Sequence, residues 1–513
     1  MTAGAPEARA DGEPEEPIDL PLLIMRMSLL TDLARDVPFE SALVASFVSL
    51  DLADAAGVSA AERRAVFYAS MLRYLGCTAY SSELVEVFDA EERSLHARFA
   101  QVDGSDRAAL AQAIQAAGPR VPLEQVASAV RGGLVVSQCE VAQRSAQRLG
   151  LEPLVAQVLG ELFEAWDGSG GPRGLRGDQL ARATRVMHVG YAAALPLRAR
   201  GPGGAAELLA AWSGTQLDPA LVEVALRRLP ELHERCASPS IWEACAEMAP
   251  AERRPRAVVD DLAMLLADFA DLKSVYRLGH SPAVAELAAA AARQLGLGAK
   301  AERDARLAGL VHDVGMVAVS TNVLDRAQGL SLSELERVHS HAYYTRRVLS
   351  SVPELEHVAS IAGAHHERLD SSGYPAGVGV ASLPLLARVV AAADVARALM
   401  EARPHRPALT VPFVSKHLQE EVARGRLDAA AVEAVRSVLE QRAPSSSRAT
   451  LFTPRQVEVL RLLAHGLTEK EIAGELGLSP RTVHHHITAI YERAGVSSRA
   501  AVALFAVDNG LLI

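Results

Sequence analysis

The sequence predicts an all-α protein with two tandem helical domains and a small C-terminal domain. Of its 513 residues, half are hydrophobic and only 4% are aromatic. Alanine and leucine, which are abundant, favour helices, while the aromatic residues that favour strands are scarce. From Ile18 nearly to the end, apolar residues recur at helical spacing. The length allows about three domains of roughly 150 residues each.

The charge and the cysteines restrict the class of protein. A formal net charge of −10 argues against a surface adapted throughout to nucleic acid, but leaves room for one small DNA-binding domain. The four cysteines show no spacing typical of a metal or disulfide site, as expected for reduced thiols. The chain begins without a basic-then-apolar leader, and no uncharged apolar run reaches the about 18 residues of a membrane helix. We therefore expect a cytoplasmic protein without a membrane segment.

Changes in composition divide the chain. Residues 1–17 are rich in Ala, Glu, Pro and Gly and are expected to form a disordered acidic tail. Residues 443–450 are polar and are expected to form a flexible linker. Prolines near residue 250 mark a further boundary. The expected domains are therefore residues 18–250, 251–442 and 451–513.

An internal repeat relates the first two domains. The segment Glu164–Pro172 resembles the segment Glu367–Pro375. Three further matches keep the same order: Met71–Gly76 with Leu310–Gly315, Thr184–Val186 with Ala387–Val389, and Leu217-Asp218 with Leu427-Asp428. Such self-similarity indicates a duplicated domain.

The second copy carries histidines and aspartates within apolar segments, as at His312-Asp313 and His365-His366. An ionised aspartate is costly to bury without a partner, and a metal would relieve that cost. Imidazole and carboxylate are the ligands that divalent transition metals prefer when thiolate is absent. One such residue alone is more often a hydrogen-bonded core residue, but seven together predict a metal site. The seven are His280, His312, Asp313, His341, His365, His366 and Asp394.

These motifs resemble a known enzyme family. His312-Asp313 is similar to the dyad of HD-superfamily phosphohydrolases, and His365–Pro375 resembles the defining motif of the HD-GYP subfamily. The resemblance covers most of residues 251–442. It implies an all-α HD-type domain that holds divalent metal ions, iron or manganese, and hydrolyses a cyclic dinucleotide such as c-di-GMP. Tyr276 stands where members with three ions have Glu, which favours two ions.

The resemblance also implies roles for single residues. One metal would be held by His280, His312, Asp313 and Asp394, and Asp313 would bridge to a second metal held by His341, His365 and His366. Such a pair of metals activates a water and clamps the oxygens of a phosphodiester. Arg403 and Arg406 would grip substrate phosphate through their planar forks. Gly373, Tyr374 and Pro375 would form the loop that gives the subfamily its name.

Several positions depart from the subfamily pattern. Met316 replaces a lysine, Arg397 an acid, Ser371 a glycine and His405 a tyrosine. The metal ligands are therefore retained more completely than the substrate-binding residues. We favour a phosphodiesterase. The alternatives are a nucleotide sensor with little or no turnover and a phosphohydrolase for another nucleotide.

The first copy lacks every metal ligand. Arg73-Tyr74 stands at the place of the HD dyad, Leu162-Phe163 at the place of the paired histidines, Tyr191 at that of Asp394, and Ser41 near that of His280. We expect a degenerate HD-GYP-like domain that holds no metal. Its role is open between a scaffold for the second copy, a ligand-sensing domain and a contact domain that sets the oligomeric state.

The C-terminal residues carry the start and stop signals of short helices. Thr453-Pro454, Thr468 and Ser479-Pro480 each predict a helix start. A turn containing Gly477 joins two of these helices, which predicts a helix-turn-helix whose second helix enters a DNA major groove.

This module resembles the LuxR-type helix-turn-helix, a four-helix DNA-binding domain. The resemblance assigns groove and phosphate contacts to Arg481, Thr482, Val483, His484, His486 and Arg493. The module carries six basic and six acidic residues, and because phosphate contacts dominate DNA affinity, one copy would bind weakly. We therefore expect a homodimer that binds DNA and regulates transcription, with a cyclic dinucleotide or another nucleotide as its second ligand.

Overall fold

The computed structural model describes residues 16–88, 90–99, 102, 107–122, 124–126, 133–236, 240–441 and 451–512. These residues are mainly helical, with two strands of two residues each, and the all-α prediction is confirmed. Among them, no helix is long and apolar enough to cross a membrane. The expected linker at 443–450, and all of the expected tail except its last two residues, lie outside the described residues.

The helices of the first half are α1 (Leu20–Ala34), α2 (Ser41–Ala55), α3 (Ala60–Leu72), α4 (Ser81–Val87), α5 (Glu92–Phe99), α6 (Arg107–Ala116), α8 (Val135–Arg148), α9 (Pro153–Gly160), α10 (Arg182–Trp212), α11 (Pro219–Cys236) and α12 (Ile241–Met248), with 3₁₀ turns η1 (Cys77–Tyr80) and η3 (Gly177–Gln179). Those of the second half are α13 (Val258–Asp271), α14 (His280–Gln294), α15 (Gly298–Val311), α16 (Thr321–Leu324), α17 (Leu332–Leu349), α18 (Glu356–Ala362), α19 (Leu385–Met400), α20 (Val411–Ala423) and α21 (Ala429–Gln441), with 3₁₀ turns η4 (Val314–Ala318) and η5 (Val380–Ser382). The C-terminal module contains α22 (Pro454–Ala464), α23 (Glu469–Leu476), α24 (Pro480–Ala494) and α25 (Arg499–Asp508).

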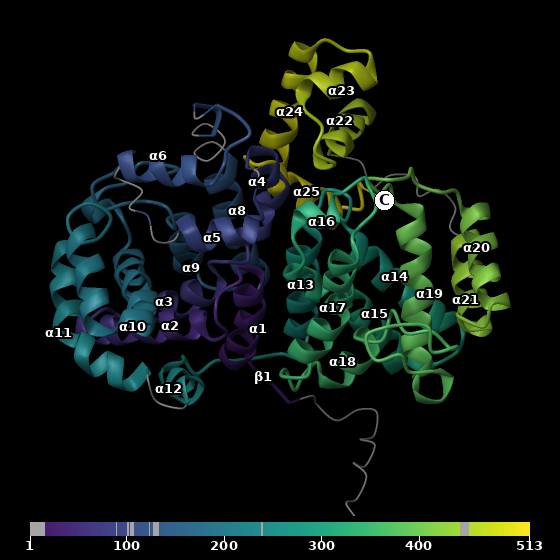
Figure 1. Ribbon diagram of the computed structural model, residues 1–513, viewed down its shortest axis with the longest axis horizontal. Coiled ribbons are helices and arrows are strands. Elements are labelled where there is room, and N and C mark those ends of the chain that lie inside the picture. The colour runs from purple at the N-terminus through teal and green to yellow at the C-terminus, as the bar shows by residue number, and fades with distance from the viewer. Residues whose placement is uncertain are drawn as a thin grey trace, which may run out of the picture.

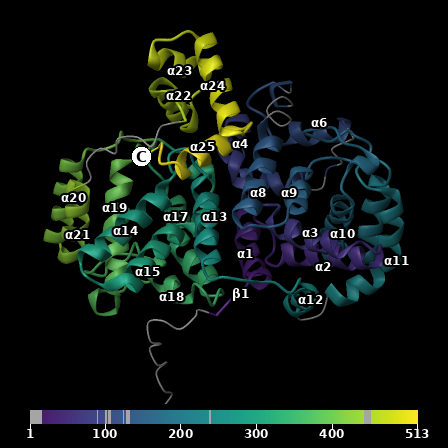
Figure 2. The same cartoon turned by 180° about the vertical axis from the view of Figure 1, so that it is seen from behind.

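Two helical bundles lie side by side, and the C-terminal module sits over their junction (Figures 1 and 2). The strands β1 (Ile18–Asp19) and β2 (Arg253–Arg254) pair in antiparallel fashion, which ties the start of the first bundle to the segment between the bundles. One hydrophobic core extends from α1 to α21, and α1 packs against η4 and α17 of the second bundle. The boundary expected at residues 250 and 251 stays a prediction.

The ends of two helices bring polar side chains into the second bundle. Helix α14 follows Gly279, whose φ of 75° lies in the left-handed region that favours glycine, so His280 is its first residue. Helix α15 ends at Val311, and His312 and Asp313 come directly after it. The two helices pack against each other and against α19, so their polar ends meet.

The C-terminal module has an apolar core of its own. Thr453 and Thr468 cap α22 and α23, and Gln456 and Glu471 return the hydrogen bond to each cap. Helix α23 ends at Leu476, and the next residue, Gly477, caps it with a φ of 63°. The predicted four-helix helix-turn-helix is confirmed.

Candidate metal centre

Asp313 reaches the middle of the second bundle because η4 packs directly against α17. A Cβ atom on Gly315 would lie only 2.0 Å from the carbonyl oxygen of His341, so this close approach requires glycine. The hydroxyl of Thr345 accepts from the backbone N–H of Gly315 and donates to the carbonyl of His312. These contacts hold the HD dyad beside His341.

The seven predicted metal-binding residues form two clusters. The His341 cluster contains Asp313, His341, His365 and His366, and the His280 cluster contains His280, His312 and Asp394. Within each cluster the candidate ligand atoms lie within 4.8 Å of one another. The structure therefore brings together all seven residues, which come from the ends of α14, α15 and α18 and from within α17 and α19.

Asp313 lies between the two clusters. Its Oδ1 atom is 3.2 Å from Nε2 of His341 and 3.5 Å from Nε2 of His365. Its Oδ2 atom is 3.1 Å from Nε2 of His312 and 3.7 Å from Nε2 of His280. Each oxygen of one carboxylate thus faces a different set of imidazoles.

The imidazoles are oriented through their Nδ1 atoms. Nδ1 of His312 lies 2.8 Å from the carbonyl of Gly309, and Nδ1 of His365 lies 2.6 Å from that of Ala362. His341 makes the same contact with its preceding turn, and Nδ1 of His280 lies 2.8 Å from Glu401 Oε2. A carbonyl or carboxylate accepts only from a protonated Nδ1, which leaves Nε2 as the inward-facing lone pair.

Burial keeps most of these imidazoles neutral. It lowers the pKa of His312 and of His341 to about 3 and that of His365 to about 4. Burial opposes ionisation of Asp394, but the nearby His280 and His312 imidazoles outweigh it and hold the Asp394 pKa well below its usual range. Neutral imidazole and ionised carboxylate are the forms that bind metals.

The donor set fits divalent metal ions. Within the described part of the chain, His312 Nε2 and Asp313 Oδ1 are buried without a hydrogen-bond partner. Buried polar atoms of this kind are normally satisfied, and both point into the cluster of ligand atoms. Nitrogen and oxygen donors without thiolate suit iron, manganese and similar transition metals.

Arg277 is a residue of the site that the sequence analysis missed. Its side chain is 10% exposed, and its Nη2 donates to Asp313 Oδ2. Burial lowers its pKa, and the nearby Arg403 lowers it further. Its position three residues before His280 could have indicated that it lies near the site. Met316, at the family's lysine position, is 6% exposed and packs with Val319, so Arg277 brings a cation to the centre that Met316 does not.

The two predicted phosphate-binding arginines have different surroundings. Arg403 donates to Glu401 Oε2 at 3.0 Å and to the carbonyl of Tyr276 at 3.2 Å, so it borders the His280 cluster through Glu401. Arg406 donates to carbonyls at the end of α19, among them Leu399 at 3.0 Å and Ala398. Those contacts cap the helix, and the phosphate role of Arg406 stays a prediction.

The loop at Gly373, Tyr374 and Pro375 packs on the His341 cluster. The Tyr374 ring stacks on His366, with centroids 4.6 Å apart, and on His339, with centroids 3.9 Å apart. A Cβ on Gly373 would lie 2.4 Å from the carbonyl oxygen of His366, so glycine is required. The Glu367 carboxylate accepts from backbone N–H groups of the same loop, at Ala376 and Val378.

The predicted DNA-binding residues lie on α24, but one assignment is wrong. Val483 is fully buried in the core of the C-terminal module, so it does not reach base edges. Consecutive helical residues point about 100° apart, and the exposed face instead contains Arg481, His484 and His485. His484 also contacts Glu469 of α23 at 2.9 Å.

The remaining predicted contacts are partly engaged within the module. The hydroxyls of Thr482 and Ser479 lie 2.8 Å apart at the start of α24. Arg493 donates to Gln456 Oε1 at 2.7 Å, and His486 is half-buried. The DNA contacts assigned to these three side chains stay predictions.

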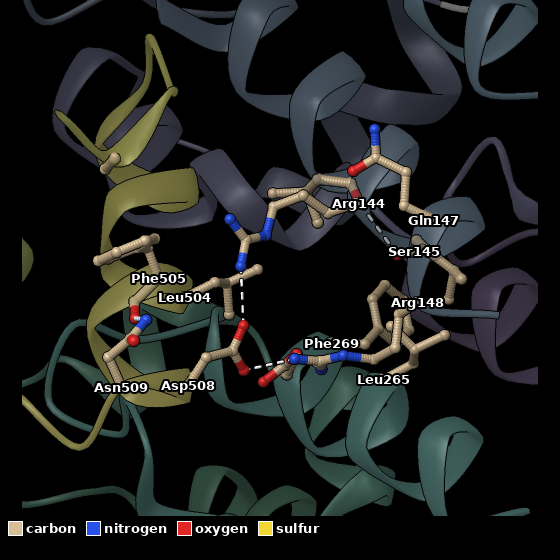
Figure 3. A pocket seen from close by; sticks show the side chains of 14 residues that line it. Arg144, Ser145, Gln147, Arg148, Leu265, Phe269, Leu504, Phe505, Asp508 and Asn509 are labelled. Carbon is tan, nitrogen blue, oxygen red and sulfur yellow. Dashed lines mark hydrogen bonds and ion pairs between the residues drawn. The ribbon is translucent and has the colours of Figure 1, made fainter. Parts of the chain in front are cut away.

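The C-terminal module is docked on both bundles. Asp508 of α25 pairs with Arg144 at 2.7 Å and with Arg148, both on α8, and Arg148 also pairs with Asp268 of α13 at 2.7 Å (Figure 3). These residues border a cavity of about 500 Å³ whose apolar side includes Leu504. A helix of each bundle therefore meets the last helix of the module at one place.

Comparisons with known proteins agree with this geometry. Residues 264–431 match the HD domain family, and residues 450–506 match the bacterial regulatory proteins of the luxR family. The 3′3′-cGAMP-specific phosphodiesterase 3 of Vibrio cholerae is 26% identical over 408 residues, covering 76% of this chain and 89% of that protein. The cyclic di-GMP phosphodiesterase response regulator RpfG of Xanthomonas campestris is 35% identical over 206 residues, covering 38% and 52%. A crystal structure of a cyclic GMP-AMP specific phosphodiesterase of V. cholerae has a TM-score of 0.57 and 22% identity, and covers 83% of this chain and 99% of that one, which shows the fold.

Proposed function

We propose that this chain, which carries an HD domain followed by a LuxR-type helix-turn-helix domain, hydrolyses a phosphodiester of a cyclic dinucleotide and regulates transcription by binding DNA. The observation that carries the proposal is Asp313, whose two oxygens face two different histidine clusters. A carboxylate in that position suits two adjacent metal ions. We assign residues 18–250 to a first helical domain, 251–442 to an HD-GYP domain and 451–513 to the DNA-binding domain.

The two clusters would hold two divalent ions, iron or manganese, with Asp313 between them. Such ions, when bound, activate water at neutral pH and neutralise charge on a phosphodiester. The chain's own residues supply the orientation: backbone carbonyls and Glu401 fix the imidazoles. Arg277 and Arg403 supply positive charge for the substrate phosphate, for which the guanidinium fork is well suited. The Tyr374 ring covers His366 and excludes water from that side.

The relatives support the substrate class. They are named for 3′3′-cGAMP and for cyclic di-GMP, and both molecules are cyclic dinucleotides with two phosphodiester bonds. The proposed substrate is therefore this class.

The test is hydrolysis by the purified full chain after reconstitution with iron or manganese. The panel contains c-di-GMP, 3′3′-cGAMP and a linear dinucleotide, and metal content is measured alongside. Asp313→Ala should lose both metal and at least about a hundredfold of the turnover, because losing even an indirect supporter of a metal ligand costs 10–100-fold. His417→Ala on α20, outside both clusters, is the matched control and should keep both. Turnover that survives in Asp313→Ala would contradict the proposal.

The contact between Arg277 and Asp313 favours a second candidate function. A guanidinium that occupies one oxygen of the central carboxylate disfavours a cation there, so the domain would bind the dinucleotide without hydrolysing it. Tight binding without turnover in the metal-loaded protein would support this candidate. An Arg277→Ser variant that gains metal and turnover would identify Arg277 as the cause.

The proposed DNA-binding form is a cytoplasmic homodimer. The module carries as many acidic as basic residues, and phosphate contacts dominate DNA affinity, so two copies are needed for firm binding. Gel-shift titration against random duplexes, with the mass of the complex measured by light scattering, tests this. A complex that contains one chain per duplex would contradict the homodimer.

A further inference from the structure

The first bundle reproduces the frame of the metal centre without its ligands. A Cβ on Gly76 would lie 2.2 Å from the carbonyl oxygen of Gln138. In the second bundle, a Cβ on Gly315 would lie 2.0 Å from the carbonyl oxygen of His341. The Asp32 carboxylate accepts from the backbone N–H of Ala42, ten residues later, and the Asp271 carboxylate accepts from that of Ser281, also ten residues later. In the first bundle α2 packs against α3 and α10, and in the second α14 packs against α15 and α19.

The loops correspond as well. Glu164 accepts from the backbone N–H groups of Arg173 and Leu175, at the same sequence separations as Glu367 in the second bundle. These pairs place one residue of the first bundle at each ligand position. In chain order those residues are Ser41, Arg73, Tyr74, Gln138, Leu162, Phe163 and Tyr191.

Two buried arginines lie at this place. We call Arg35, Arg73, Tyr74 and Tyr191 the first-bundle site. The guanidinium carbon of Arg73 lies 3.8 Å from the centroid of the Tyr191 ring, and that of Arg35 lies 3.5 Å from the centroid of the Tyr74 ring. Arg35 Nη2 also donates to the Tyr191 hydroxyl at 3.1 Å. Cation–π contacts hold both guanidinium groups in defined positions.

These arginines have unused donors. Their exposed fractions are only 3% and 9%. Nε of Arg35, and Nε and Nη1 of Arg73, are buried without a hydrogen-bond partner. A buried cation without a partner costs several kcal/mol or more.

The nearby acid does not balance this charge. Burial raises the pKa of Asp32 to about 7, although Arg35 opposes the rise. At neutral pH the Asp32 carboxyl is therefore only partly ionised, so it offsets only part of the charge of the two guanidinium groups. Two buried guanidinium groups with unpartnered N–H donors suit an anion with several oxygens.

We propose that the first-bundle site binds the phosphate of a nucleotide and does not hydrolyse it. Guanidinium groups take the place that metal ions would have in the second bundle. Phe163 corresponds to His366 and is 37% exposed, so it offers a flat apolar face to a nucleobase. Because no metal ligand stands at any of the seven positions, the bound phosphodiester meets no activated water.

The site is adjacent to the helix that holds the DNA-binding module. Gln138 of α8 donates to the carbonyl of Arg73 at 3.1 Å. The same helix carries Arg144 and Arg148, which pair with Asp508 of α25. A ligand that binds Arg73 therefore contacts a residue that is hydrogen-bonded to α8, the helix that pairs with α25 of the C-terminal module.

The experiment measures ligand binding to the full chain in excess EDTA, which removes metal-dependent binding and turnover from the second bundle. The probes are inorganic phosphate, c-di-GMP and 3′3′-cGAMP. Binding is measured by calorimetry and by the shift of the thermal unfolding midpoint. Chloride at equal ionic strength is the reference. The variants are Arg73→Met and the milder Arg73→Lys. Arg63→Met, which loses a surface pair with Asp54, is the matched control.

We expect the wild-type chain to bind one equivalent of ligand. Arg73→Met should bind it at least tenfold more weakly, and Arg73→Lys should have an affinity between those of Arg73→Met and wild type. Arg63→Met should bind with the wild-type affinity. Phosphate that competes fully with the dinucleotide would define a phosphate site, and dinucleotide binding alone would add the base contact. No binding of any probe in EDTA, or equal binding by Arg73→Met, would overturn the proposal. Since the metal-loaded assay of the second bundle is separate, either proposal can fail alone.

Discussion

The carboxylate of Glu92 lies 2.6 Å from the ammonium group of Lys273, and their side chains are only 2% and 1% exposed. Glu92 belongs to the first bundle and Lys273 to the second. The remaining bonding capacity is also used, because Glu92 accepts from Ser320 at 3.0 Å and Lys273 donates to the carbonyl of Val317 at 3.2 Å. Lys273 outweighs the effect of burial and lowers the pKa of Glu92. This buried pair fastens the two bundles together.

Glu92→Ala should therefore lower the free energy of unfolding by about 3–5 kcal/mol, since it leaves an uncompensated buried ammonium group. Urea unfolding of the full chain at pH 7 measures the change. Asp54→Ala, which breaks the surface pair with Arg63, should cost no more than about 1 kcal/mol. Equal losses of unfolding free energy in the two variants would mean that the buried pair stabilises the chain no more than a surface pair does.

Asp32 predicts a pH dependence of stability. Burial raises its pKa from 3.8 to about 7, so between those values the folded chain binds more protons than the unfolded chain. Its stabilising contribution is full below about pH 4 and is lost as the pH rises through 7. Asp32→Asn removes the effect and should gain up to about 4 kcal/mol over wild type between pH 4 and pH 8.

The measurement is the difference in unfolding free energy between wild type and Asp32→Asn at several pH values, which cancels the other titrating groups. A difference that stays constant with pH would refute the raised pKa. Asp54→Asn, with an exposed carboxylate, is the control and should show little slope.

Val483 and Arg481 should separate stability from DNA binding. Val483→Ala opens a hole in the core of the module and should destabilise it by about 1–3 kcal/mol. Arg481→Ala, on the exposed face, should leave stability unchanged, weaken DNA binding and reduce the salt slope of log affinity by about one. Thermal unfolding and salt-dependent DNA titration test both, and normal stability in Val483→Ala would contradict the buried placement.

Asp508→Ala should loosen the docking of the C-terminal module, because Arg144 loses its anion and Arg148 loses one of its two. Partly exposed ion pairs contribute up to about 1 kcal/mol each, so a severalfold larger detached fraction is expected. Hydrogen exchange should then rise in peptides of α8 and α13, while peptides of α15 keep their protection. Glu458→Ala, which breaks the surface pair with Arg455, should leave all of these peptides unchanged.

The sequence was sufficient to predict the residues of the two clusters, because each is a polar residue in an apolar segment and matches a motif of the HD-GYP subfamily. Arg277 was missed because its partner Asp313 is 36 residues away, and an arginine in a loop is usually solvated. Glu92 and Lys273, 181 residues apart, could not be paired without the packing of the two bundles. Val483 was misassigned because family likeness was used where helical geometry decides which side faces the core.

Arg148 has one guanidinium and two acceptors, Asp268 in the second bundle and Asp508 in the DNA-binding module. A shift of Arg148 towards one carboxylate weakens its hold on the other, so the two parts of the chain compete for a single cation. Coupling of this kind is reciprocal. Whatever factor a bound nucleotide applies to the affinity for DNA, bound DNA must apply to the affinity for the nucleotide. DNA bound to the C-terminal module would then change nucleotide binding, just as bound nucleotide would change DNA binding.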